Sequence, residues 1–135
     1  MKINFRPEVP DVDQFWNLFQ TTGWNERYQL LAEELARALQ SSWYVLSVYD
    51  GERLVGFGRL VSDGVVHAML YDLIVLPEYQ GQGIGGKILE RLVEKCKGVG
   101  VRDIQLFCAV GKRGFYEKRG FAARPDNAPG MQYIR

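Results

Sequence analysis

The sequence has almost no net charge. Its 17 Lys and Arg residues nearly balance 16 Asp and Glu residues, and it contains a single histidine. A chain without a basic excess has no general electrostatic attraction for nucleic acid or for an anionic membrane surface. Its apolar runs are also much shorter than the roughly 20 residues that cross a bilayer. We therefore expect neither a nucleic-acid partner nor a membrane partner.

Cysteine is equally scarce. Cys96 and Cys108 are the two cysteines, and their spacing fits neither a metal site nor a redox motif. Each falls in an apolar pattern, so both are predicted to be reduced and buried. No signal-peptide pattern opens the sequence. These features lead us to expect a cytoplasmic protein without a metal ion.

Apolar residues are abundant. Hydrophobic residues make up 47% of the 135 positions and aromatic residues 13%, which is typical of a globular protein. No linker, repeat or low-complexity tract divides the chain. At this length, one hydrophobic core is the expected organisation. We predict a single domain over residues 1–135.

The order of the predicted elements indicates an α/β (α+β) chain with a single mixed, mostly antiparallel sheet flanked by helices. Turn residues, caps and apolar periodicity predict an edge strand at the start, two helices over 11–22 and from about residue 25, and strands over 43–49, 54–61 and 66–76. After these we expect a helix over 83–97, a central parallel strand over 101–110, a short helix over 112–120, and a final hairpin.

The stretch YQGQGIGGK, residues 79–87, places four glycines between a strand and a helix. Gly81, Gly83 and Gly86 match the dinucleotide-binding pattern GxGxxG. That fold also needs an acidic residue at the end of its second strand, whereas Asp103 opens a strand here. The loop also follows an antiparallel meander, so this first interpretation is disfavoured.

A second interpretation is the phosphate loop of nucleotide hydrolases. Gly81, Gly86 and Lys87 fit that motif, but Ile88 stands where a Ser or Thr hydroxyl would bind Mg²⁺. A third interpretation is that the glycines only form a tight turn between strand and helix. One or two glycines would be enough for that purpose.

Three motifs in order favour a fourth interpretation. The segments DLIVLPEYQGQGIGGKILERL, IQLFCAV and GFYEKRGF together resemble the GNAT N-acetyltransferases in sequence and spacing. The resemblance covers most of the chain and is weakest over residues 1–45. It implies the GNAT fold, acetyl-CoA as the co-substrate, and transfer of the acetyl group to a primary amine.

The resemblance also implies the residues that bind acetyl-CoA. Backbone N–H groups of the glycine loop would point at the pyrophosphate, and a splayed strand at residues 70–76 would pair with the pantetheine arm. The family's asparagine after the strand 104–110 is missing here, so Lys112 or Arg113 would contact the phosphate arm instead. The predicted cofactor-binding residues are Leu73, Ile74, Val75, Gln80, Gly81, Gln82, Gly83, Ile84, Gly85, Gly86, Lys87, Lys112 and Phe115.

Tyr116 is the predicted acid. It matches the family's tyrosine whose hydroxyl faces the sulfur of CoA, and a phenol with a pKa near ~10 can protonate a thiolate. The alternative is a tyrosine that only packs in the core, as the neighbouring Phe115 and Phe121 are expected to do.

Asp72 is the predicted base. It lies within an apolar strand, where an unpaired carboxylate is costly and often accepts protons. The alternative is a structural ion pair with an arginine. His67 is a natural base near neutral pH but precedes Asp72 by five residues, so a structural or exposed role is favoured for it.

The expected acceptor is a small primary amine. The C-terminal segment GFAARPDNAPGMQYI resembles small GNAT enzymes similar to plant and cyanobacterial serotonin N-acetyltransferases, which act on arylalkylamines. Trp16, Trp24, Tyr28 and Tyr71 would then line an aromatic slot beside Asp72. A protein or peptide amine, or a non-catalytic acyl-CoA-binding module, are the alternatives. The family resemblance also suggests a homodimer.

Overall fold

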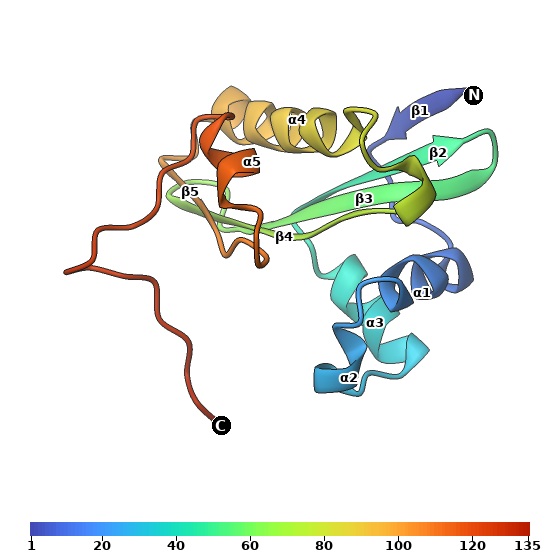
Figure 1. The fold of residues 1–135 in the computed structure, drawn as a ribbon, viewed down its shortest axis with the longest axis horizontal. Coiled ribbons are helices and arrows are strands. Elements are labelled where there is room, and N and C mark those ends of the chain that lie inside the picture. Colours follow the sequence, from blue (N-terminus) through green and yellow to red (C-terminus); the bar gives the residue numbers. More distant parts are fainter.

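The computed structural model describes residues 1–135 as one mixed sheet with helices on both faces (Figure 1). The strands lie in the order β1-β2-β3-β4-β5. The first four are antiparallel neighbours and β5 runs parallel to β4, so the predicted mixed, mostly antiparallel sheet is confirmed. The strands are β1 (Ile3–Arg6), β2 (Tyr44–Asp50), β3 (Arg53–Ser62), β4 (His67–Val75) and β5 (Asp103–Leu106).

The helices cover the two faces of this sheet separately. Figure 1 shows the N-terminal helices on one side and the later helices on the other. The first group contains α1 (Val12–Gln20), α2 (Asn25–Tyr28) and α3 (Ala32–Gln40), and the second contains α4 (Ile84–Val99) and α5 (Arg113–Glu117). A 3-10 turn, Pro77–Tyr79, follows β4. None of these helices is both long enough and apolar enough to cross a membrane.

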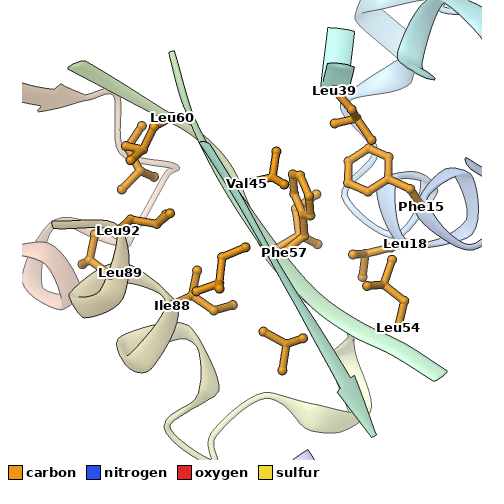
Figure 2. Close-up of a cluster of buried hydrophobic side chains, with 14 of the residues drawn as sticks. Phe15, Leu18, Leu39, Val45, Leu54, Phe57, Leu60, Ile88, Leu89 and Leu92 are labelled. Carbon is orange, nitrogen blue, oxygen red and sulfur yellow. The ribbon is translucent and has the colours of Figure 1, made fainter. Parts of the chain in front are cut away.

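The core fills the space between the sheet and both helical layers (Figure 2). Phe15 and Leu18 of α1 pack on one face, and the rings of Phe15 and Phe57 form a T-shaped pair with centroids 4.6 Å apart. Ile88 and Leu92 of α4 are fully buried on the other face. A Cβ at Gly58 would lie 2.8 Å from the Ile88 side chain, so a glycine lets α4 approach the sheet closely.

The segment after residue 25 is not the continuous helix that the sequence predicts. Gln29 adopts a left-handed conformation with φ 54°, which ends α2. The Asn25 side chain accepts a hydrogen bond from the Leu30 N–H at 2.8 Å, and Glu34 accepts from the Leu31 N–H at 2.8 Å to start α3. These local side-chain bonds compete with helix propagation. Tyr28 and Leu31, at the ends of this break, are exposed.

Strand β5 is parallel to β4, as predicted, but it lies at the edge of the sheet rather than in its centre. The reason is that no hairpin follows it. Residues 122–135 contain no helix or strand, and Figure 1 shows them as an irregular tail. Pro125 and Pro129 each lack the N–H that a strand pairing would use. The predicted final hairpin is therefore wrong in this structure.

The two cysteines differ in their surroundings. Cys96 is fully buried on α4, as predicted, whereas Cys108 is exposed in the loop after β5. Because β5 ends at Leu106 and no strand covers its outer edge, the segment that carries Cys108 stays open to solvent. The prediction of a buried Cys108 is therefore wrong.

A bulge in β4 opens the sheet where it meets the glycine loop. Phe57 pairs with Ile74 and Arg59 pairs with Tyr71, so Asp72 and one neighbour lie opposite a single residue of β3. Asp72 has φ 56°, a left-handed conformation that is uncommon outside glycine. The pairing of β4 with β5 stops at Leu70, so the end of β4 beyond the bulge has no strand on that side.

Candidate active site

Two adjoining cavities lie where β4 and β5 separate. The glycine-loop cavity has a volume of about 460 Å³ and lies between the end of β4, the start of α4 and α5. The aromatic cavity, of about 550 Å³, lies between the N-terminal helices, the middle of β4 and the loop after β5. Both volumes are in the range of small-ligand sites. The cavities share four lining residues, namely Trp24, Leu73, Ala109 and Tyr116.

The open end of β4 forms one wall of the glycine-loop cavity. Leu73, Ile74 and Val75 all line it, as predicted from the resemblance. The Val75 carbonyl accepts a hydrogen bond from the Gln80 side-chain amide at 2.9 Å, so this carbonyl faces away from β3. Along a strand, the backbone N–H and C=O groups of successive residues point alternately to its two neighbours. The unpaired side of β4 therefore carries backbone polar groups with which an extended ligand can form hydrogen bonds.

The glycine loop forms the second wall. Gly81 and Gly83 have φ of 79° and 83°, and a Cβ at either position would meet no atom within 4 Å. These glycines therefore serve a left-handed backbone beside open space, rather than close packing within the protein. The loop residues Gln80, Gly81, Gly83, Ile84, Gly85 and Gly86 line the cavity, whereas Gln82 and Lys87 do not.

The first turn of α4 directs unpaired donors at this cavity. Its first regular hydrogen bond runs from the Lys87 N–H to the Gly83 carbonyl at 3.1 Å, so the N–H groups before Lys87 have no acceptor within the helix. Gly83 is the residue before the helix. Free N–H groups and the positive end of the helix dipole make this point suitable for a phosphate.

Helix α5 forms the third wall. Lys112, Phe115, Tyr116 and Arg119 all line the glycine-loop cavity, whereas Arg113 does not. The sequence predictions included Lys112 and Phe115. Arg113 instead pairs with Glu117 on the surface at 3.1 Å. Lys112 and Arg113 were the two alternatives predicted for the phosphate arm, and only Lys112 lies at the cavity.

Tyr116 lies at the junction of the two cavities. Its ring packs edge-on against Phe115 at 5.0 Å and against Phe121 at 6.0 Å between centroids. Burial raises the pKa of its phenol above the ordinary value, and the neighbouring Cys108 raises it further. The phenol is therefore protonated at neutral pH and can donate a hydrogen bond at the junction. Its packing against aromatic rings fixes where the hydroxyl lies.

Asp72 lies on the wall of the aromatic cavity in an ion pair. Its Oδ2 accepts a hydrogen bond from Arg59 Nε at 2.7 Å, and both side chains are mostly buried. Arg59 Nη1 also donates to the Ser42 hydroxyl at 3.2 Å, so the guanidinium is held from two sides. This arrangement matches the ion-pair interpretation. Oδ1 has no protein partner and stays available to a ligand in the cavity.

The aromatic cavity contains most of the predicted slot. Trp24, Tyr28 and Tyr71 line it together with Asp72. Trp16 does not, because it lies on α1 and packs against the core. His67 also lies outside both cavities. Its side chain is exposed, and its Nδ1 lies 3.5 Å from Asp103 Oδ2 at the far end of β4.

Sequence reasoning missed several residues of the cavities. Thr21, Thr22, Tyr79 and Arg119 line the glycine-loop cavity, and Arg27 and Phe107 line the aromatic cavity. The threonines follow α1 and Arg27 lies in α2, where no sequence motif identifies them. Arg119 alone carried a signal, because it is a charged residue on the apolar side of the short helix GFYEKRGF.

Comparisons with known proteins agree with this geometry. The model of the acetyltransferase (GNAT) family matches residues 9–121. A chloroplastic serotonin N-acetyltransferase 2 of Oryza sativa subsp. japonica is 37% identical over 129 residues, covering 93% of this chain and 63% of that protein. An uncharacterised N-acetyltransferase of Pyropia yezoensis is 30% identical over 140 residues, covering 96% of this chain and 79% of that protein.

A solved structure shows the same fold. A GNAT family acetyltransferase from Streptococcus pneumoniae TIGR4 is 30% identical with a TM-score of 0.78, covering 99% of this chain and 97% of that one. The cavities therefore belong to an acyltransferase fold, and the chain belongs to the GNAT acetyltransferase family. The rice and Pyropia yezoensis relatives are both named as N-acetyltransferases.

The match to the rice enzyme covers only part of that protein. The chain spans less than two thirds of the length of that relative. The rice enzyme is named as chloroplastic, so the cytoplasmic location expected from the sequence stays a prediction.

The glycine-loop cavity fits acetyl-CoA. It offers an open strand edge for the extended pantetheine arm and unpaired N–H groups for a diphosphate. Space beyond Gly81 and Gly83 lets phosphate oxygens approach the bare backbone. Of the cofactor-binding residues that the family resemblance implied, all but Gln82 and Lys87 line this cavity, and their contacts with acetyl-CoA stay a prediction.

Proposed function

We propose that this protein acetylates a small primary amine, held in the aromatic cavity while acetyl-CoA occupies the glycine-loop cavity. The observation that carries the proposal is that the two cavities meet at Tyr116 and share four lining residues. An amine in one cavity can therefore attack a thioester carried in the other, in a single ternary complex. Because both reactants are already bound side by side, the chemical step does not lose the translational and rotational entropy of a bimolecular encounter.

Tyr116 supplies the proton or hydrogen bond for the leaving thiolate. Its raised pKa keeps the phenol neutral, but also makes complete proton transfer to a thiolate less favourable. We therefore assign it the role of a hydrogen-bond donor that stabilises negative charge as it develops on the sulfur of CoA. Position at the junction of the cavities supports this role.

Asp72 orients the amine. Arg59 occupies Oδ2, whereas Oδ1 is available on the wall of the aromatic cavity. A carboxylate oxygen there attracts an ammonium group and accepts a hydrogen bond from the amine after deprotonation. Asp72 also shapes the strand, since its left-handed conformation forms the bulge that opens β4. Asp72, the residue predicted as the base, therefore also helps to position the end of β4.

An aromatic amine fits the cavity best. Trp24, Tyr28 and Tyr71 provide flat apolar surfaces, and Phe107 lines the side toward β5. The cavity's charged lining residues are Asp72 and Arg27, so it offers one carboxylate for one ammonium group. The rice relative is named as a serotonin N-acetyltransferase, which supports an arylalkylamine acceptor by similarity.

A panel of amines tests this proposal. Thiol release from acetyl-CoA would be measured with tryptamine, phenethylamine, spermidine and lysine-bearing peptides. We expect the highest kcat/KM for the two arylalkylamines. Turnover of the peptides alone would contradict a small-amine acceptor, and acetyl-CoA binding without turnover of any amine would favour a non-catalytic acyl-CoA-binding module.

A further inference from the structure

We propose that Arg119 is an anion-binding residue of this site, and that its guanidinium binds the diphosphate of acetyl-CoA. This assignment deepens the proposed function and rests on acetyl-CoA occupying the glycine-loop cavity. Arg119 lines that cavity and follows α5 by two residues. It lies outside the strand edge and the glycine loop, the two features that the sequence motif predicts.

The guanidinium lies against the first turn of α4. A Cβ built on Gly86 would be 2.6 Å from Arg119 Nη2 and 2.9 Å from Nε. Gly86 therefore provides the space that the arginine occupies. Because helical Cβ bonds tilt toward the N-terminus, the guanidinium covers the part of α4 where the N–H groups lack acceptors. Two sets of hydrogen-bond donors thus converge on one place.

This placement is unfavourable unless an anion is bound. No carboxylate lies within ion-pair distance of Arg119, and its buried Nε has no hydrogen-bond acceptor. The neighbouring end of α4 carries the positive end of the helix dipole, which repels a cation. Leaving this buried donor unsatisfied destabilises the folded protein. A diphosphate between the guanidinium and the α4 N–H groups would relieve both effects.

The arginine is also held in place before any ligand binds. Nη1 donates to the Phe115 carbonyl at 2.9 Å, and the guanidinium carbon lies 4.2 Å from the centroid of the Phe115 ring. A structural role as a cap for α5 would use Nη1 alone. It does not explain a buried Nε without an acceptor beside donors of another helix. Arginine's planar fork is suited to two phosphate oxygens at once.

Calorimetry on Arg119→Met tests the assignment, with Lys118→Met as the matched control. Lys118 is exposed, adjacent in sequence and absent from the lining of the cavity. We expect Arg119→Met to weaken acetyl-CoA binding about 10- to 100-fold, the range of a charge-assisted hydrogen bond, and Arg119→Lys to restore part of it. Lys118→Met should bind as the wild type does.

Two further measurements separate an anion-binding role from a structural one. S-acetylpantetheine lacks the diphosphate, so Arg119→Met should leave its KM as a donor unchanged. The melting temperature of the ligand-free variant should not fall, because removing the unsatisfied buried Nε offsets the loss of the hydrogen bond to the Phe115 carbonyl. Equal weakening toward both donors, or a lower melting temperature, would overturn the assignment. Unchanged acetyl-CoA affinity with normal wild-type turnover would overturn it while leaving the proposed function intact.

Discussion

A single methyl group at Gly85 should separate acetyl-CoA binding from folding. Gly85 lies in the first turn of α4 and lines the glycine-loop cavity. An added Cβ would lie 3.6 Å from the Phe115 ring and 3.7 Å from the Val75 side chain, which are ordinary contacts. The ligand-free protein can therefore accept alanine. The same methyl group stands between the walls where the arm of acetyl-CoA is proposed to pass.

The expected magnitude follows from these contacts. Displacing a phosphate or amide of the ligand from the N–H groups of α4 removes at least one charge-assisted hydrogen bond, about 1.5–3 kcal/mol. The affinity for CoA should fall by about 10- to 100-fold, since each 1.4 kcal/mol is a factor of ten. Stability should not fall, because alanine is favoured over glycine within helices by up to about 1 kcal/mol.

Gly98→Ala is the matched control. Gly98 lies in the same helix, has no unusual φ, and a Cβ there would meet nothing within 4 Å. Calorimetric titration with CoA and thermal denaturation should show both variants folded and only Gly85→Ala impaired in binding. Equal CoA affinity in the two variants would refute the proposal that the arm of acetyl-CoA passes beside Gly85. A strongly destabilised Gly85→Ala would refute the packing argument.

Three more variants address the chemistry and the acceptor. Tyr116→Phe keeps the aromatic packing, so CoA affinity should stay the same while kcat falls by roughly 10²–10⁴-fold in steady-state kinetics; an unchanged kcat would leave Tyr116 as a packing residue. Because burial raises the pKa of Tyr116, wild-type kcat should show no alkaline decline below the ordinary phenol value of ~10, and a decline well below it would exclude the tyrosine as donor. Asp72→Asn should lower kcat/KM for the amine most at low pH, and an identical pH profile would count against a role in amine orientation. The same variant leaves Arg59 unpaired, so the free energy of unfolding should fall by about 1–3 kcal/mol in denaturant titrations. Trp24→Phe should raise the KM of an arylalkylamine, whereas Trp16→Phe should not, since only the former lines the aromatic cavity; equal KM values would place the amine elsewhere.

The parts of the site that come from local sequence were predictable. The junction of strand, glycine loop and helix depends on neighbouring residues, so its motif places Gly81, Gly83 and Gly85 correctly at a cavity. The motif FYEKRGF likewise brings Tyr116 to the same place. The sheet followed from turn residues and alternating patterns, which are also local.

The parts that depend on distant contacts were not predictable. Whether Asp72 is a lone carboxylate or an ion pair depends on Arg59, which a neighbouring strand places beside it. Arg119 gains its significance only when α5 packs against Gly86 of another helix. The break at Gln29 results from side-chain hydrogen bonds that a helical periodicity does not reveal.

The C-terminal segment shows another limit. Its proline-rich turn predicted a hairpin, but Met131, Tyr133 and Ile134, beyond that turn, are almost fully exposed. A strand pattern states which face would be buried, not whether a partner strand is present to bury it. The edge of β5 has no partner in this structure, so the pattern has nothing to pair with.

Initial-rate kinetics with acetyl-CoA and an arylalkylamine varied together test the central claim most directly. If the two cavities hold both substrates at once and meet at Tyr116, double-reciprocal plots should intersect, as a ternary complex requires. Parallel plots would contradict the account, because they indicate an acetylated enzyme intermediate formed before the amine binds. The exposed thiol of Cys108, which lines the aromatic cavity, would then be the group to examine.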